Sequence, residues 1–381
     1  MKRKPRVLFV VTEDWYFWSH RLGLARNARD AGYEVVLIAR YSAYRAQIEA
    51  ENIRCIALPF ERSLRHPGRD LHCLIALAKL IRAERPTIVH LVALKPILLS
   101  ALAVLTAPHV SFIHAVTGLG YLFTAEGAPA RGMRVLVLCL LRWLLGRRNS
   151  SLLVQNDDDL QELRKHGVGD LARTRLIAGV GVDTLQFSPA YAEEEQIPLV
   201  ILPARLLRDK GICEFLDAAK RILRRGVNVR FALVGALDLD NPAALRTEEL
   251  KAMLLPGIEW WGIRADMASI YRRAAIVCLP SYREGLPKVL LEAAACGRPL
   301  IATDVPGCRE ICRNNSTGLL VPLRNSEALE QAIVQLLADP LRRRDFGVRA
   351  RSIIEAEFSL AMIAKQTLDF YGELHGVESG I

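Results

Sequence analysis

The motifs of several common protein classes are missing from the 381 residues. The eight cysteines form no CxxC pair and mostly lie in apolar runs, a pattern typical of buried thiols in a reducing compartment. Cys308 and Cys312 have no matching His or Cys cluster, so we expect no metal site. The first apolar run leads to TEDWYFW instead of GxGxxG, which disfavours an oxidoreductase. No zinc-finger spacing, RNP-like motif or helix-turn-helix signature occurs, so we expect no nucleic-acid partner.

No apolar segment is long enough to predict a membrane span. Residues 97–107 form a run of about eleven residues, short of the ~20 that cross a bilayer, and predict a core helix. Residues 131–148 are apolar but carry several arginines. Two interpretations stay open for this second segment: an interfacial helix on anionic lipid, or a buried helix whose arginines reach the surface.

The charge is unevenly distributed along the chain. All of the net charge of +10 lies in residues 1–190. This bias indicates an anionic partner for the first half, such as lipid headgroups or a phosphorylated acceptor. The segment MKRKPRVLFVVTEDW has a basic start but only about five apolar residues before acidic ones, so it predicts a first strand rather than a signal peptide.

Apolar runs alternate with helical patterns in two series. A strand at 6–12, a loop at 13–20, a helix ending at Gly32 and a strand at 34–40 form a βαβ unit, which implies a parallel sheet. Further strands are predicted at 53–59, 87–93, 110–116, 151–156, 199–205, 228–235, 258–262, 274–280, 299–304 and 317–322. The fold class is therefore α/β with two doubly wound domains.

The acidic stretch AYAEEEQIP at 190–198 is the predicted linker between these domains. We expect domains at 1–190 and 191–357. The closing segment 358–381 has a helical pattern up to Leu374 and is expected to pack back on the first domain.

The stretch from Ser281 to Pro306 predicts a strand end, a tight loop, a helix and a second strand. Pro287 suits the first helical position, and the free amides of Gly285, Leu286 and Lys288 would favour an anion such as phosphate. Glu284 and Glu292 can face one crevice from different depths. A dipole partner and a solvated helix residue are the alternative interpretation of these two glutamates.

A second basic loop, ARLLRDKGICEF, lies at the predicted end of another strand. Ligands bind outside the carboxyl ends of such strands, so Arg205 and Lys210 can meet the same phosphate. Lysine acts as a point charge and arginine as a fork, which suits a diphosphate leaving group. An ordinary solvated basic loop is the alternative.

The segments ARLLRDKG and SYREGLPKVLLEAAACGRPLIATDVPG, with two glutamates separated by seven residues, resemble the family 4 glycosyltransferases of the GT-B fold. IHAVTGLGYLF, VQNDDDLQEL and GVGVDTLQFSP resemble further family segments in the same order, so the resemblance covers most of the chain. In GVGVD, Val180 stands where many members have Ser. The resemblance implies two Rossmann-like doubly wound domains that face a central cleft, with the acceptor bound by 1–190 and the nucleotide sugar by 191–357.

The same resemblance implies transfer of a sugar from a nucleotide diphosphate with retention of configuration, without a metal or other cofactor. Donor-binding residues carried over from the family are Arg205, Lys210, Arg264, Glu284, Gly285, Leu286 and Glu292. Arg205 and Lys210 would hold the diphosphate, Glu284 the sugar hydroxyls and Glu292 the ribose. The expected catalytic residues are Glu284, Lys210, Arg205 and His114. His114 resembles the family histidine near the donor sugar, although a lone histidine at a strand end is more often structural.

The first half also resembles a narrower group that builds bacterial polysaccharides on polyprenyl diphosphate, through DWYFWSHR and LVALKP. This resemblance assigns His20, Arg21 and Lys95 to the acceptor phosphate. It implies a UDP-sugar donor, with an N-acetylhexosamine or hexose as the sugar, and a polyprenyl-diphosphate-linked saccharide as the acceptor. We expect the protein in the cytoplasm, on the inner face of the cytoplasmic membrane, with its anionic surface as a partner. A nucleotide-sugar 2-epimerase and a non-catalytic membrane-associated binding protein are the alternatives.

Overall fold

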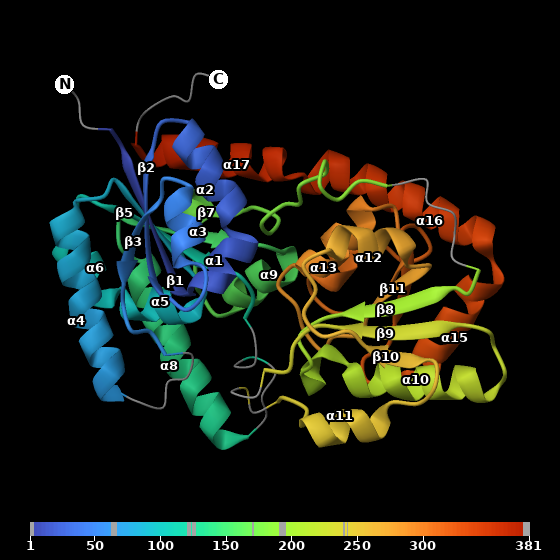
Figure 1. Cartoon of the computed structure of the whole chain (residues 1–381). Helices are drawn as coiled ribbons and strands as arrows, with labels where there is room; N and C mark the ends of the chain where they lie inside the picture. The colour runs from blue at the N-terminus through green and yellow to red at the C-terminus, as the bar shows by residue number, and fades with distance from the viewer. Residues whose placement is uncertain are drawn as a thin grey trace. The chain divides into compact units, whose positions relative to one another are not determined.

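The chain forms two compact units, Met1–Val180 with Leu360–Ile381 and Gly181–Ser359 (Figure 1). The computed structural model describes residues 4–61, 67–119, 123, 127–169, 171–189, 196–238, 241 and 243–375. The units divide at Gly181, whereas the sequence predicts a division at 190. Most of the predicted linker, residues 190–195, lies outside the described residues.

The first unit contains a seven-stranded parallel sheet in the order β3-β2-β1-β4-β5-β6-β7. Its strands are β1 Arg6–Glu13, β2 Glu34–Arg40, β3 Arg54–Ala57, β4 Ile88–Val92, β5 Ser111–Val116, β6 Ser150–Val154 and β7 Thr174–Leu176. The sequence predicts six of them. It misses β7, because these three residues are partly exposed and form no apolar run.

Both faces of this sheet are buried, which explains the continuous apolar runs of its strands. Leu8 and Val10 of β1 point into one apolar cluster, and Val7 and Phe9 point into another. On the first side lie α4 Pro67–Glu84, α5 Leu94–Leu99, α6 Ala101–Thr106, α8 Ala128–Leu145 and α9 Asp157–Lys165. On the second side lie α1 Asp14–His20, α2 Leu22–Asp30, α3 Arg45–Ala50 and α17 Leu360–His375. A short η1 at Leu171–Arg173 precedes β7.

Two secondary-structure predictions for the first unit are wrong. The loop expected at 13–20 is helix α1, since Phe17 is fully buried in the apolar cluster on the second side of the sheet. The helix expected at 97–107 is two helices that meet at Ser100, whose hydroxyl donates to the Ile97 carbonyl at 2.7 Å.

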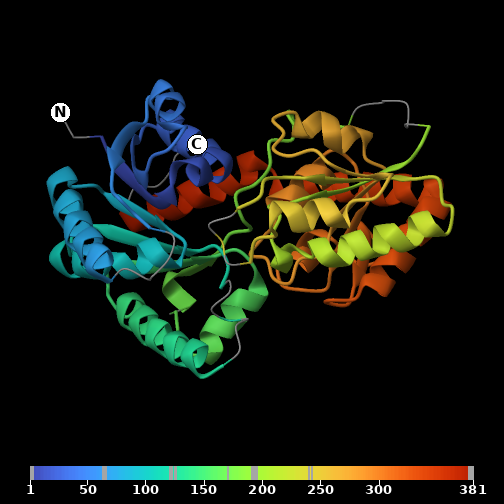
Figure 2. The ribbon, with the colours of Figure 1, turned by 60° about the horizontal axis from the view of Figure 1, so that its bottom comes forward.

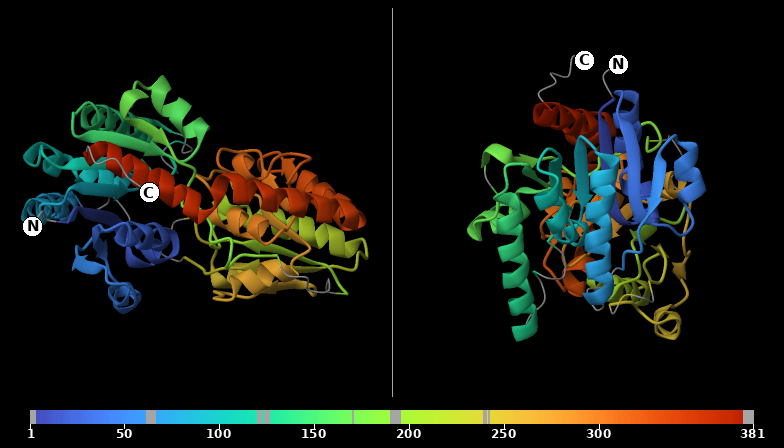
Figure 3. Two further views of the ribbon diagram at one scale, coloured as in Figure 1. Left: turned by 90° about the horizontal axis from the view of Figure 1, so that it is seen from above. Right: turned by 90° about the vertical axis from the view of Figure 1, so that its left-hand side faces the viewer.

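Helix α17 returns to the first unit and packs along α2 (Figure 3). The two helices approach closely at Gly23, where a Cβ atom would lie 2.8 Å from the Leu360 side chain. Further along, the buried Tyr371 hydroxyl lies 2.6 Å from His90 Nδ1 in β4. The C-terminal helix therefore completes the buried core of the first unit.

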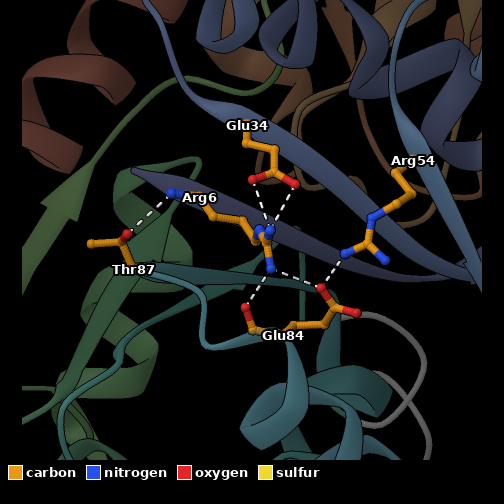
Figure 4. Close-up of polar contacts among 5 residues, drawn as sticks. All are labelled: Arg6, Glu34, Arg54, Glu84 and Thr87. Carbon is orange, nitrogen blue, oxygen red and sulfur yellow. Dashed lines mark hydrogen bonds and ion pairs between the residues drawn. The ribbon is translucent and has the colours of Figure 1, made fainter. Parts of the chain in front are cut away.

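Charged residues join the amino ends of three strands in the first unit (Figure 4). Arg6 donates to both carboxylate oxygens of Glu34 at 2.8 Å and pairs with Glu84 at 2.9 Å. Arg54 also pairs with Glu84, and the Arg6 amide donates to the Thr87 hydroxyl at 3.0 Å. This network holds together the amino ends of neighbouring strands. They lie at the edge of the sheet opposite the carboxyl edge, where α/β proteins bind ligands.

The second unit contains a six-stranded parallel sheet in the order β10-β9-β8-β11-β12-β13. The strands are β8 Leu199–Pro203, β9 Arg230–Val234, β10 Ile258–Trp260, β11 Ile276–Leu279, β12 Leu300–Thr303 and β13 Gly318–Val321. The helices are η2 Arg208–Lys210, α10 Ile212–Arg224, α11 Thr247–Met253, α12 Met267–Arg273, α13 Lys288–Ala295, α14 Cys308–Ile311, α15 Ser326–Ala338, α16 Pro340–Ile353 and η3 Ile354–Phe358. All six strands were predicted from the sequence.

The exposed side chains of helix α8, which include Cys139, are relevant to whether the first unit contacts a membrane. Helix α8 lies on the outside of the first unit (Figure 2). Its Val135, Leu136 and Cys139 side chains are exposed. Six of the eight cysteines are buried, in agreement with the sequence. Of the helices in the described part of the chain, none combines the length and the apolar character needed to cross a bilayer.

The buried carboxylate of Asp14 provides a test of the α1 assignment. It accepts hydrogen bonds from the Ser42 amide and hydroxyl, the Tyr44 amide and the Trp15 amide, at 2.7 to 2.9 Å. Burial works against the charged form, but these hydrogen bonds outweigh it and lower the pKa of Asp14. The stabilisation is thus complete above the unfolded-state pKa of ~3.9 and is lost as the pH falls through the folded-state value.

We expect Asp14→Asn to reduce the free energy of unfolding at pH 7 by about 1–3 kcal/mol, because four hydrogen-bond donors lose the charged acceptor of a buried side chain. Urea unfolding at pH 7 and at steps down to pH 3 measures the difference, which should shrink as the pH falls. Asp30→Asn is the control, since Asp30 is exposed and pairs with Arg29 at the surface. A difference that stays constant with pH would contradict this role.

Candidate donor-binding site

Three loops of the second unit meet at the carboxyl edge of its sheet, following β8, β11 and β12. Two glycines with left-handed backbone angles permit this packing. A Cβ atom on Gly211, at φ +71°, would lie 2.1 Å from the Pro280 carbonyl oxygen. A Cβ atom on Gly307, at φ +77°, would lie 2.4 Å from the Gly285 carbonyl oxygen. Any side chain at either position would displace the loop that carries Glu284.

The first two loops are joined by an ion pair. Lys210 Nζ lies 2.6 Å from Glu284 Oε1, and both side chains are largely buried, at 16% and 15% exposed. Backbone contacts hold the same loops together: the Asp209 carbonyl accepts from the Tyr282 amide at 2.8 Å and from the Ser281 hydroxyl at 3.2 Å. The structure thus brings Lys210 and Glu284 together from positions 74 residues apart.

Helix α13 begins directly after this loop. Pro287 is its N-cap rather than its first residue, so the helix starts one residue later than predicted. Within the described chain, the backbone amides of Leu286 and Lys288 have no hydrogen-bond partner. Unpaired amides at a helix start carry partial positive charge and attract anions. Gly285 and Leu286 are half-buried in the loop beside them.

Glu292 lies one turn into α13 and is held at both carboxylate oxygens. The Tyr271 hydroxyl donates to Oε2 at 3.0 Å, and Lys288 Nζ lies 2.9 Å from Oε1. The side chain is 8% exposed, so it is nearly buried. This is not the solvated helix residue that the alternative interpretation expects.

Two further arginines predicted for donor binding are paired with aspartates. Arg205 Nη1 lies 2.8 Å from Asp238 Oδ2, with the arginine 45% exposed. Arg264 makes a two-pronged contact with Asp266 at 2.7 and 2.8 Å, and both are half-exposed. Both arginines are half-exposed, although Asp238 is only 11% exposed, so each guanidinium can exchange its partner for a bound anion.

The chemistry of these groups suits a nucleotide diphosphate. Lys210, the amides before α13 and the exposed Arg205 can hold negative charge. Glu284 and Glu292 can accept hydrogen bonds from hydroxyl groups.

His114 occupies a different environment in the first unit. It lies inside β5, not after it, and is fully buried. Its Nε2 is 3.0 Å from the Ser150 hydroxyl, and burial lowers its pKa to about 3, which keeps the ring neutral. These are the surroundings of a core histidine. Its assignment as a catalytic residue stays a prediction, while Gly120 of the same segment lies outside the described residues.

The three residues predicted for acceptor phosphate have unlike surroundings. Lys95 lies in α5, 2.7 Å from Asp70, so its charge is already paired. His20 ends α1, stacks on Tyr16 and lies 2.6 Å from the Ser19 hydroxyl. Lys95 follows β4, as expected of a residue after a strand, whereas His20 lies at the end of the first helix rather than at its start.

Arg21, which lies between α1 and α2, is unusual because its guanidinium is buried and partly unpaired. Its side chain is 2% exposed, and Nε and Nη2 have no hydrogen-bond partner among the described residues. These two atoms form one edge of the guanidinium, the edge that binds carboxylates in Arg26 and Arg264. A buried charge without a partner is costly to the fold.

Three contributors to the donor-binding surface were not predicted from the sequence. Tyr271 lies 21 positions before its partner Glu292, and no local spacing signals the contact. Gly307 is recognisable only through its packing against another loop. The contact from Lys288 to Glu292 has the i, i+4 spacing of a helical ion pair and could have been predicted.

Residues 6–156 match the family described as "Glycosyl transferase 4-like", and residues 197–339 match "Glycosyl transferases group 1". A Campylobacter jejuni relative named N,N'-diacetylbacillosaminyl-diphospho-undecaprenol alpha-1,3-N-acetylgalactosaminyltransferase is 26% identical over 96% of this chain and 98% of its own. An Escherichia coli relative named UDP-Gal:alpha-D-GlcNAc-diphosphoundecaprenol alpha-1,3-galactosyltransferase is 26% identical over 71% of each chain.

Among solved structures, sucrose-phosphate synthase from Thermosynechococcus elongatus matches with a TM-score of 0.84 at 21% identity. The match covers 98% of this chain and 100% of that one. At this identity the likeness shows the fold alone, and that fold is the one the sequence predicted. The two family matches together cover more than half of the sequence. The chain therefore belongs to the glycosyltransferases, with a 4-like first domain, a group 1 second domain and the GT-B fold.

Proposed function

We propose that this glycosyltransferase moves a sugar from a UDP-sugar to a polyprenyl-diphosphate-linked saccharide, with retention, in the assembly of a bacterial surface polysaccharide or glycan. The observation that carries the proposal is the contact of Lys210 with Glu284 beside the open start of α13. Two relatives whose names state diphospho-undecaprenol acceptors support the acceptor class. Their names also give an N-acetylhexosamine and a hexose as transferred sugars, and one gives a UDP donor.

On the donor side, the diphosphate would lie between Lys210 and the amides of Leu286 and Lys288. Lys210 has three N–H donors, so it can turn from Glu284 toward a phosphate oxygen while keeping its charge in place. Glu284 is then available to accept a hydroxyl of the sugar. Arg205 can exchange its exposed contact with Asp238 for the outer phosphate.

The chemistry needs no nucleophile from the protein. The acceptor hydroxyl attacks the anomeric carbon from the face on which the diphosphate departs, and the leaving phosphate oxygen takes the hydroxyl proton. The C–O bond to the phosphate breaks as the new glycosidic bond forms. The chain contributes positioning and stabilisation of the charge on the departing diphosphate, which Lys210 and Arg205 supply in place of a metal ion.

On the acceptor side, we assign the unpaired edge of Arg21 to a phosphate of the lipid diphosphate, which requires the acceptor to uncover this buried edge as it binds. An arginine edge of this kind matches two phosphate oxygens in a bidentate contact. His20 is the adjacent residue and can donate a further hydrogen bond.

An assay of nucleotide release distinguishes this proposal from its alternatives. UDP- and GDP-sugars are offered with a panel of polyprenyl-diphosphate saccharides, and the product mass is read. The proposal predicts UDP release that depends on the lipid acceptor. An altered sugar released from donor alone would identify an epimerase, and donor binding without nucleotide release would identify a binding protein.

Donor-site variants should separate turnover from binding. We expect Lys210→Ala to lower kcat about 10²- to 10³-fold, since it removes a cation that stabilises the leaving group. Glu292→Ala should mainly raise the donor KM, by roughly 10- to 100-fold, because a charged hydrogen bond to the ribose is lost. Steady-state kinetics measures both, with exposed Lys251→Ala as the control. Wild-type kinetics for a folded Lys210→Ala protein would contradict the assignment of Lys210 to the donor diphosphate.

Arg21→Met should raise the acceptor KM about tenfold or more and leave the donor KM unchanged, because two hydrogen bonds to phosphate are lost. The melting temperature should hold or rise, since the variant removes an unpaired buried charge. Arg26→Met in the adjoining helix α2 is the control, because Glu51 holds the same guanidinium edge there. A fall in melting temperature with an unchanged acceptor KM would instead show that Arg21 is structural.

We assign the exposed face of α8 to the membrane surface. Val135 and Leu136 are 62% and 63% exposed, and Arg131 and Arg142 flank them on the same helix. Apolar contact and positive charge both favour an anionic bilayer.

Leu136→Glu should therefore weaken binding to phosphatidylglycerol vesicles in a sedimentation assay, because it places a negative charge at the lipid surface. Activity on a short-chain, water-soluble acceptor should stay unchanged. Leu341→Glu, at an 80% exposed leucine of α16, is the control. Equal vesicle binding by Leu136→Glu and wild type would show that this face of α8 does not contact the membrane.

A further inference from the structure

Tyr271 is a side chain of the donor site that neither the family motifs nor the local sequence explains. It lies in α12, is fully buried and contacts Phe187 edge-to-face at 6.1 Å. Its hydroxyl donates to Glu292 Oε2 at 3.0 Å, while Lys288 Nζ holds Oε1 at 2.9 Å. Among the described residues, these two side chains hold the Glu292 carboxylate.

We infer that Tyr271 is a positioning residue that turns the Glu292 carboxylate toward the two neighbouring hydroxyls of the donor ribose, and so makes the enzyme select ribonucleotide over 2′-deoxyribonucleotide donors. The inference rests on the proposed function, because it takes Glu292 as the ribose contact.

The two partners of Glu292 act differently. Lys288 is 26% exposed on a flexible side chain of the same helix, so it supplies charge more than direction. Tyr271 has a rigid ring fixed by burial, so its hydroxyl fixes one oxygen in space. Burial and the Glu292 charge raise the pKa of Tyr271 well above its ordinary value, which keeps the phenol protonated and a donor.

The remaining hydrogen-bonding capacity of Glu292 fits a ribose. A carboxylate can accept about four hydrogen bonds, and each oxygen of Glu292 uses one. Each oxygen can therefore accept one more, and the cis 2′ and 3′ hydroxyls can supply one each. A 2′-deoxy donor leaves one oxygen of a nearly buried carboxylate short of a donor, and such sites discriminate strongly.

The test compares the affinities of the full chain for UDP and 2′-deoxy-UDP by isothermal titration calorimetry. Wild type should bind UDP roughly 10- to 100-fold more tightly than the deoxy analogue. Tyr271→Phe should cut this ratio by about threefold or more, mainly by weakening UDP, and should raise the donor KM more than it lowers kcat. Tyr371→Phe, which removes a buried tyrosine hydroxyl bonded to His90 in the first unit, should leave the ratio unchanged.

A double variant shows whether Tyr271 acts through Glu292. Glu292→Gln should lower the ratio by itself, and adding Tyr271→Phe should lower it no further. The inference is overturned if Tyr271→Phe keeps the wild-type ratio, or if it has the same effect in both backgrounds. If Tyr271→Phe does not fold, Glu292→Gln alone decides, because an equal ratio for Glu292→Gln and wild type would show that the carboxylate Tyr271 is said to position does not select the ribose, and this overturns the inference. Failure of the wild type to bind UDP would overturn the proposed function instead.

Discussion

The ion pair between Lys210 and Glu284 is the contact on which the donor site depends. It joins the loop after β8 to the loop after β11, and it brings the one largely buried lysine of the site beside the start of α13. A pair this far from water is strong only when the surrounding geometry is fixed. Backbone contacts from Asp209 to residues 281 and 282 fix it, so the loops are preorganised before any ligand binds.

The parallel sheet explains why such a contact can form at all. Strands β8, β11 and β12 are neighbours in the sheet and point the same way, so their carboxyl ends share one edge. The glycines at 211 and 307 then let three backbones approach within distances that no side chain would allow. In the first unit, the amino edge is instead tied by the charged network around Arg6 (Figure 4).

Sequence reasoning succeeded where the signal is local. Apolar runs buried on both faces identified every strand except the short β7, and the stretch from 281 to 306 identified the loop and helix of the donor site. It failed where a contact joins distant segments. Tyr271 reaches Glu292 from another helix, and α1 is helical because Phe17 and Asp14 find partners elsewhere in the fold.

Two residues show what local motifs cannot decide. His114 matches a family histidine by sequence, but only the structure reveals its burial inside β5. Arg21 was assigned to the acceptor phosphate by resemblance, but only the structure reveals that it is buried with a guanidinium edge that has no partner among the described residues. Burial and hydrogen-bond satisfaction depend on the whole fold, so no spacing rule could have supplied them.

A crystal structure of the full chain with UDP bound tests the central claim most directly. We expect the diphosphate to contact Lys210 and the amides of Leu286 and Lys288, and the ribose hydroxyls to donate hydrogen bonds to Glu292. A diphosphate bound away from Lys210, or a ribose that does not contact Glu292, would contradict it.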